Sequence, residues 1–176
     1  VTLFMPSMLW AESSMYLGYN TNGLPHHATR DALEVIAALG YRGVGLTLDH
    51  HCLPPGAPTL ASDLAAVRRC LRELDLRVVI ETGGRFVLDQ FRKHYPTLMT
   101  TDRADRERRI EFYRHALDVA ESLESRVVSL WSGIRPDEGP RAPALDRLVD
   151  GLGPVLDDAR RRGIEIAFEP EPGMFV

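Results

Sequence analysis

The sequence predicts an α/β protein of the (β/α) barrel type, with parallel strands and helices alternating along one chain. Short apolar stretches typical of buried strands alternate with amphipathic helical stretches, and a last strand closes the series. The predicted strands stop beside residues suited to a ligand cavity, near Asn20, Leu48, Glu81, Trp131 and Glu169. Residues 20–23, after the first strand, lack the second and third glycines of a dinucleotide-binding turn, which disfavours an open nucleotide-binding sheet.

Composition is that of one globular domain. The 176 residues are 44% hydrophobic and 26% charged, which is enough apolar material for a sizeable core. The net charge of −4 argues against a nucleic-acid partner, and no apolar run approaches the ~20 residues of a membrane span. Cys52 and Cys70 fit neither a metal-binding spacing nor a disulfide framework. We therefore expect a reducing compartment, the cytoplasm.

The chain divides at about Met15. Residues 1–14 are apolar but broken by Pro6, and no Lys or Arg precedes Arg30, so the basic start of a secretory signal is missing. We expect residues 1–14 to be an N-terminal arm or tag-like segment, with Met15 as a reasonable natural start. Residues 15–176 then form the partial barrel domain.

The first half of the domain is predicted from turn residues and apolar periodicity. Residues 22–25 break the first strand, Thr29 can cap a helix, and Gly40 ends that helix. The apolar positions of the second helix recur at helical spacing. The expected elements are a strand over 15–21, a helix over 29–39, a strand over 44–48, a helix over 62–75 and a strand over 76–81.

The second half begins with a long connection over 82–101, which we expect to carry function or a short helix, because long unstructured connections are uncommon. The basic run 103–109 is interleaved with acidic residues and is expected to form a solvated helix face. Gly151, Gly153 and Pro154 are expected to kink or split the last helix. The expected elements are a helix from Asp102, a strand over 126–131, a helix over 144–162 and a strand over 164–168.

The sequence predicts about five strands and four helices. Five strands do not close a (β/α) barrel, which normally takes eight strands and about 250 residues. The last strand would leave unpaired backbone groups and an uncovered apolar face. We expect one of two arrangements. The sequence is the N-terminal part of a longer protein, or another copy covers the open edge in a homo-oligomer.

Glu169 is the leading candidate for chemistry. It ends a strand rich in β-branched and aromatic residues, and Pro170 biases it toward an extended backbone. A carboxylate held at the carboxyl end of a parallel strand can bind a hard metal ion or move a proton. The alternative is a surface glutamate at a turn. Glu171, two residues on, should point to the opposite face, so we expect only Glu169 to reach the cavity.

Histidines follow the first two predicted strands, at the same rim of the barrel. A neutral imidazole can bind substrate or shuttle protons near physiological pH. The alternative is a set of solvated or loop-packing side chains. The candidates are His26 and His27 after the first strand, and His50 and His51 after the second.

Glu81 ends the third strand as Glu169 ends the fifth. It could bind a ligand in the cavity, or it could form a buried ion pair with Arg85. His94 and His115 are expected to be structural, because His115 lies on a predicted helix facing away from the strand ends.

Three segments resemble the xylose isomerase-like superfamily of sugar isomerases, sugar epimerases and divalent-metal endonucleases. Residues 167–172, Ala-Phe-Glu-Pro-Glu-Pro, look like the E-P-K-P turn whose Glu ends strand five and binds the metal. Residues 48–53, Leu-Asp-His-His-Cys-Leu, look like the F-H-D-D-D-L end of strand two, where a His contacts the sugar. Residues 127–133, Val-Val-Ser-Leu-Trp-Ser-Gly, are similar to the strand-four segment ending W-G-G, whose Trp walls the pocket.

The resemblance implies a metal-dependent sugar or sugar-phosphate isomerase or epimerase that acts by carboxylate-assisted proton transfer next to a carbonyl. Glu169 would bind Mg²⁺, Mn²⁺ or Co²⁺ and act with His51 in catalysis. The family's remaining ligands, an Asp, a His and a Glu, would lie beyond Val176. Substrate would contact His50, His26, His27, Trp131 and Glu81.

The resemblance breaks at Glu171, which stands where xylose isomerases have their catalytic Lys. That change disfavours their hydride-shift route and keeps a non-catalytic, metabolite-binding barrel as an alternative. A metal-dependent apurinic-site endonuclease of the same superfamily is the other alternative, although it would need a basic DNA groove.

Overall fold

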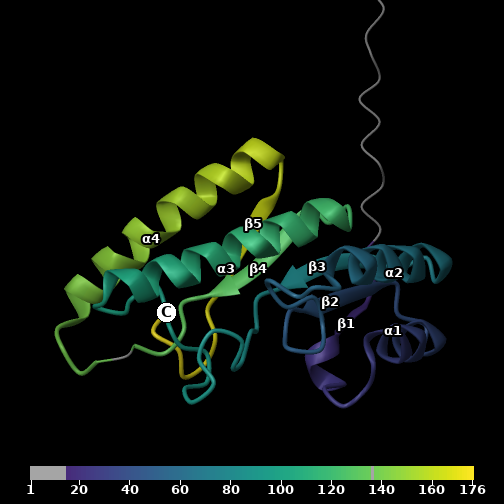
Figure 1. Ribbon diagram of the computed structural model, residues 1–176, viewed down its shortest axis with the longest axis horizontal. Coiled ribbons are helices and arrows are strands. Elements are labelled where there is room, and N and C mark those ends of the chain that lie inside the picture. The colour runs from purple at the N-terminus through teal and green to yellow at the C-terminus, as the bar shows by residue number, and fades with distance from the viewer. Residues whose placement is uncertain (1–14, 136) are drawn as a thin grey trace, which may run out of the picture.

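The computed structural model describes residues 15–135 and 137–176, so the arm expected over residues 1–14 lies outside it. Within these ranges five parallel strands form one sheet in the order β1-β2-β3-β4-β5, and helices connect them (Figure 1). The strands are β1 (Gly18–Asn20), β2 (Gly43–Thr47), β3 (Arg77–Glu81), β4 (Val127–Trp131) and β5 (Glu165–Glu169). The helices are η1 (Thr21–Gly23, 3₁₀), α1 (Thr29–Ala38), α2 (Leu60–Glu73), α3 (Arg103–Ser122) and α4 (Arg141–Arg162). The predicted parallel α/β alternation is confirmed.

The two faces of the sheet differ in chemistry because successive side chains of a strand point to opposite sides. One face packs into a single apolar core with the helices; its buried strand residues include Leu46, Ile80, Val128 and Leu130. The register places Leu46 beside Ile80 and Ile80 beside Val128. The opposite face, here called the inner face, carries glycine and polar residues such as Gly45, Thr47, Glu81 and Ser129.

The helix ends follow local rules, but the last helix is not split where the sequence predicts a split. Asp102 caps α3, its side chain accepting a hydrogen bond from the Asp105 backbone N–H at 3.1 Å. Gly163 ends α4 with a φ of 66°. The α4 helix runs unsplit through Pro154. Tertiary packing outweighs the lost hydrogen bond: Leu98 packs on Gly151, where a Cβ atom would lie 3.0 Å from Leu98 Cδ2.

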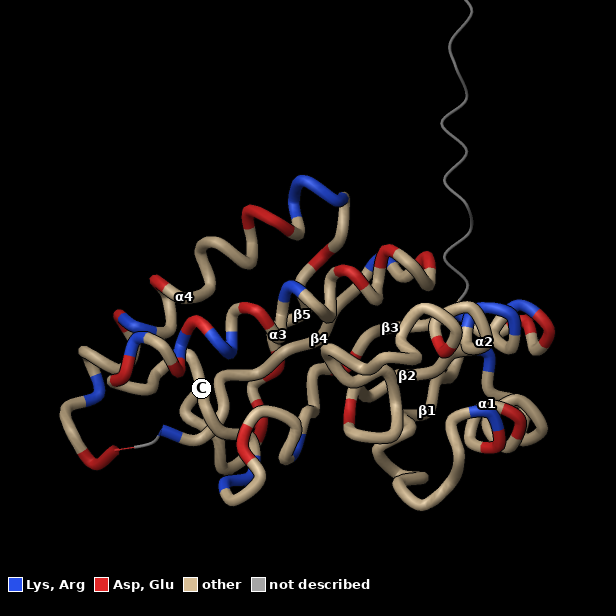
Figure 2. Tube along the Cα trace, in the orientation of Figure 1, with Lys and Arg blue, Asp and Glu red and all other residues tan. Residues whose placement is uncertain are grey.

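The basic run at the start of α3 is solvated except at one position. Basic and acidic residues are interspersed along the outer helices (Figure 2), as the sequence predicts. Arg109, however, is only 2% exposed, which corrects the expectation of a wholly solvated face. Its guanidinium turns inward because it binds backbone carbonyls of the preceding connection.

The connection between β3 and α3 contains no helix, so the short helix considered there is not formed. The segment instead folds inward and places Leu98 and Met99 in the core. Arg147 of α4 fastens it by donating from Nε to the Met99 carbonyl at 2.6 Å. None of the helices described is long and apolar enough to cross a membrane.

Candidate functional site

Polar side chains gather on the inner face at the carboxyl ends of the strands. We call this group the strand-end site; its members are Asn20, Thr47, Glu81, Ser129, Trp131 and Glu169. The register aligns them in rows, because Thr47 pairs with Glu81, Glu81 with Ser129, and Trp131 with Glu169. Partners in parallel strands point to the same face, so these side chains share one surface. Ligands bind at this end of the strands in (β/α) barrels.

A glycine makes room for the Glu81 carboxylate. A Cβ atom at Gly45 would lie 3.2 Å from Glu81 Oε1 and 3.2 Å from Asn20 Nδ2. The space that this missing side chain leaves is therefore shared by a carboxylate and an amide. Asn20 is held in turn by Thr47, whose Oγ1 donates to Asn20 Oδ1 at 2.7 Å. The result is a polar cradle over β2.

The two strand-end carboxylates act on each other. Glu81 is half-buried, and burial raises its pKa above the ordinary value, with a second upward contribution from the negative charge of Glu169. Glu169 itself is exposed at the end of β5. Glu81 has no cationic partner among the described residues, because Arg85 donates from Nε to Asp49 Oδ2 at 2.8 Å instead. The alternative of a Glu81–Arg85 ion pair is thus wrong.

The β4 strand contributes a hydroxyl and a ring. Ser129 Oγ is buried and has no hydrogen-bond partner in the part of the chain that the structure describes. Trp131 is half-buried, and the edge of the His94 ring meets it at a centroid distance of 4.8 Å and an interplanar angle of 86°. The site therefore offers a hydroxyl group that can still bond and an aromatic wall.

The four histidines after β1 and β2 lie to one side of the carboxylates. His50 and His51 are exposed and line a cavity of about 470 Å³ with residues of α1 and α2, including Leu33 and Val67. His27 and His51 both border a narrow space that also touches Thr47 and Arg85. His26 is exposed. The structure brings His27 and His51 near the β2 end of the strand-end site, whereas β3 and β4 separate β2 from Glu169.

The cysteines do not supply a nucleophile. Burial raises the pKa of Cys52 to about 11, so its thiol stays neutral at physiological pH. Burial also raises the pKa of Cys70. Both are free thiols in the structure.

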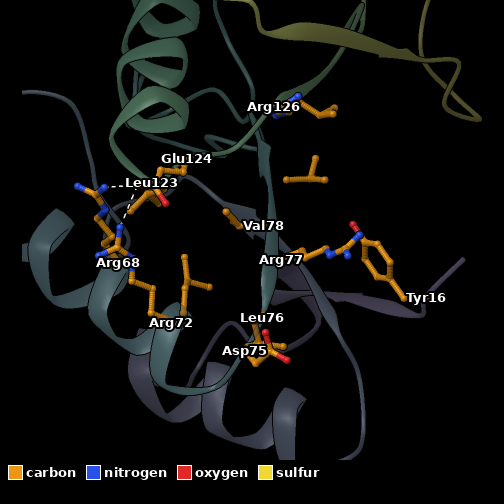
Figure 3. Close-up of a pocket in the computed structure, with 13 residues that line it drawn as sticks. Tyr16, Arg68, Arg72, Asp75, Leu76, Arg77, Val78, Leu123, Glu124 and Arg126 are labelled. Carbon is orange, nitrogen blue, oxygen red and sulfur yellow. Dashed lines mark hydrogen bonds and ion pairs between the residues drawn. The ribbon is translucent and has the colours of Figure 1, made fainter. Parts of the chain in front are cut away.

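A larger cavity, of about 590 Å³, lies at the other end of the sheet (Figure 3). It borders the first residues of β3 and β4, Arg77 and Val127. Two of its arginines share one carboxylate: Arg72 Nη2 lies 2.9 Å from Glu124 Oε1, and Arg68 binds the same group. No member of the strand-end site lines it. We therefore place function at the carboxyl ends, as is usual for this architecture.

The repulsion between Glu81 and Glu169 gives a stability prediction. Glu81→Gln is expected to raise the free energy of unfolding at pH 7 in EDTA. The folded state binds the Glu81 proton more tightly than the unfolded state does. The stability that the protonated Glu81 contributes is therefore complete below the ordinary pKa of 4.5 and is lost as pH rises through the raised pKa. The gain in stability from Glu81→Gln should be smaller by a few tenths of a kcal/mol in a Glu169→Gln background, where the repulsion is absent. The difference is small because water screens the exposed Glu169.

Urea unfolding of the wild type, the two single variants and the double variant, at pH 4 and pH 7, measures the coupling. An identical gain in both backgrounds would mean that the two carboxylates do not interact.

The donor chemistry of the site suits part of a hard-cation site. Mg²⁺ and Mn²⁺ prefer carboxylate, carbonyl and water oxygens, and two neighbouring carboxylates without a cation repel each other. No cluster of three or more His, Cys, Asp or Glu residues in the described ranges is arranged to hold a metal. A complete site would need ligands in addition to Glu169 and Glu81.

Sequence reasoning missed the partners of these carboxylates. Asn20 was marked only by its place at a strand end, Thr47 was not marked, and nothing local indicates that Gly45 admits Glu81. Ser129 was one residue within an apolar strand. His115 agrees with its expected structural role, since its Nε2 lies 2.8 Å from the Leu53 carbonyl oxygen.

Comparison with known proteins identifies one family model and several solved structures of similar fold. A family model described as xylose isomerase-like TIM barrel matches residues 33–176. No curated protein sequence matches the chain.

Several solved structures share its fold. A D-tagatose 3-epimerase-like protein is 18% identical, with a TM-score of 0.71 over 90% of this chain and 54% of that protein. A D-allulose 3-epimerase from Methylomonas sp. is 20% identical, with a TM-score of 0.67 over 91% and 53%. The 3-keto-D-glucoside 4-epimerase of E. coli is 11% identical, with a TM-score of 0.66 over 89% and 56%. At these identities the likeness concerns the fold, and this chain spans about half the length of each structure.

Proposed function

Because this chain belongs to the xylose isomerase-like TIM barrel family, we propose that it acts on a sugar or sugar phosphate as an isomerase or epimerase. The observation that carries the proposal is the pair of carboxylates, Glu81 and Glu169, on one face of the sheet at the carboxyl ends of β3 and β5, which flank β4. The similar structures include a D-allulose 3-epimerase and a 3-keto-D-glucoside 4-epimerase, which supports the same reaction class.

In this proposal Glu169 is the proton carrier. Its exposed carboxylate takes the proton from the carbon next to the sugar carbonyl and returns it to the substrate. Trp131, its partner in the register, forms an apolar wall beside the reacting carbon. Glu81 and Asn20 in the glycine cradle bind substrate hydroxyl groups. His27, His51, His50 and His26 are proposed to contact the more distant hydroxyl groups, with His51 also able to exchange protons.

A divalent cation, Mg²⁺, Mn²⁺ or Co²⁺, is proposed as the cofactor, held by Glu169 together with ligands outside the described residues. When bound, it would polarise the carbonyl oxygen and so acidify the adjacent C–H bond. Glu81 is a further carboxylate on the same face; burial, and second the negative charge of Glu169, raise its pKa, and a cation would offset the second of these.

Deuterium incorporation tests the proposal. The full-length protein is incubated in D₂O with Mn²⁺ and, separately, D-tagatose, D-psicose or D-fructose, or their phosphates, and the sugar is followed by ¹H NMR. We expect deuterium at the carbon next to the carbonyl, and loss of that exchange in EDTA. Absence of exchange with every sugar, in a protein that is folded and metal-loaded, would overturn the proposal. Thermal stabilisation by a sugar without exchange would favour the metabolite-binding alternative that Glu171 suggests.

A further inference from the structure

The connection between β3 and α3 brings one histidine, His94, to the strand-end site. His94 has a φ of 63°, and its backbone N–H donates to the Arg85 carbonyl at 2.5 Å. This left-handed backbone is uncommon for a residue with a side chain, so the surrounding contacts must hold it. The ring lies against Trp131, whose register partner is Glu169.

A buried guanidinium fixes the backbone at this point. Arg109 of α3 donates from Nη2 to the His94 carbonyl at 2.7 Å and from Nε to the Pro96 carbonyl at 2.6 Å. It is 2% exposed, and a charge at such a position needs its hydrogen bonds. Because both carbonyls belong to the connection between β3 and α3, Arg109 fixes the backbone position of His94.

The contacts of the ring also fix its tautomer. His94 Nδ1 lies 2.9 Å from the Gly83 carbonyl oxygen. A carbonyl oxygen can only accept, so Nδ1 carries the hydrogen. Burial lowers the pKa of His94, which favours the neutral ring. Nε2 is therefore a hydrogen-bond acceptor, and none of the hydrogen bonds between described residues involves it.

We propose that His94 contacts the substrate of the strand-end site, its Nε2 accepting a hydrogen bond from a sugar hydroxyl group beside Trp131. This inference rests on the proposed function and makes it more specific. An acceptor in this place favours a hydrogen-bond donor, and the hydroxyl groups along a polyol chain are such donors. It disfavours a carboxylate or a phosphate dianion there, because neither has a hydrogen to donate.

Two substitutions separate substrate contact from a structural role. In His94→Asn the amide can replace Nδ1 and keep the bond to Gly83, but nothing remains near the Nε2 position. In His94→Gln the amide reaches the Nε2 position, where its oxygen can accept, while the bond to Gly83 is lost. A substrate contact is therefore damaged more by Asn, and a structural contact is damaged more by Gln.

The experiment is calorimetric titration of the full-length, metal-loaded protein with D-tagatose, D-psicose and D-fructose, together with KM and kcat for any sugar that is turned over. We expect His94→Asn to weaken binding, or raise KM, by about tenfold, and His94→Gln by no more than about threefold. The same substitutions at His115 are the matched control, because its Nε2 is already bonded to Leu53. They should leave sugar affinity unchanged.

Equal affinity in wild type and His94→Asn, or a larger loss in His94→Gln, would overturn the role of His94 while leaving the proposed function in place. A wild-type protein that binds none of the three sugars, and that exchanges no sugar or sugar phosphate in the D₂O test, would overturn both. Melting temperatures of all variants show whether a loss of binding is only a loss of folding.

Discussion

Replacement of Glu169 by glutamine is expected to slow deuterium incorporation next to a sugar carbonyl by about 10²- to 10⁴-fold, the usual contribution of a positioned acid or base. Glutamine keeps the size of the side chain and its hydrogen-bonding oxygen but cannot take a proton. Metal affinity should fall as well, because a charged oxygen ligand is replaced by a neutral one. NMR of the D₂O reaction measures the first effect, and titration with Mn²⁺ measures the second.

Glu165→Gln is the matched control for this substitution. Glu165 lies on the same strand and the same inner face, but at the amino end, where its register partner is Val127. It should retain wild-type exchange. Folding is not expected to explain the loss in Glu169→Gln, because removing the repulsion on Glu81 leaves stability unchanged or slightly higher. Wild-type exchange rates in Glu169→Gln would rule out Glu169 as the proton carrier.

Replacement of Arg109 by methionine is expected to lower the free energy of unfolding by about 2–4 kcal/mol, since two carbonyls lose their charged donor at a buried site. Methionine fills similar space. Burial disfavours the charge of Arg109 and lowers its pKa, so removing the cation recovers part of that desolvation cost. The carbonyls of His94 and Pro96 are left unbonded, and this cost is the larger of the two. For a chain of this size the melting temperature should fall by about 5–15 °C.

Arg103→Met provides the comparison on the same helix. The Arg103 side chain is 85% exposed and its Nε lies 3.8 Å from Glu107 Oε1, so its loss should change stability by less than about 0.5 kcal/mol. Thermal and urea unfolding of the two variants test the difference. Equal stabilities of the two variants would mean that the Arg109 contacts do not hold the connection in solution.

The fold was predictable because its signals are local. Buried strands and amphipathic helices each have a period that can be read over a dozen residues, and Asp102 and Gly163 mark helix ends by their own side-chain chemistry. The order of strand ends followed from the alternation, so Glu81, Trp131 and Glu169 could be placed on one rim. The α4 helix was the exception, because the contact of Gly151 with Leu98 is not local.

The candidate site was predictable only in part for the same reason. Glu169 was singled out by its strand and by Pro170, whereas the cradle around Glu81 needs Gly45 and Asn20 from other strands. Arg85 was expected beside Glu81, four residues away in the sequence, yet it binds Asp49 from the end of β2. The histidine signal was read from adjacency along the chain, and His94 was expected to be structural, because it reaches Trp131 only through a long connection.

By itself the sequence determined the alternation of parallel strands and helices, and it placed a carboxylate at the end of the third and the fifth strand. Only the tertiary structure decided which groups surround those carboxylates. They are the polar cradle at Gly45, the ring of Trp131, and the ring of His94, whose backbone Arg109 binds. The physical reason is that strand and helix periods are set by neighbouring residues, whereas hydrogen bonds across the sheet depend on where distant segments meet.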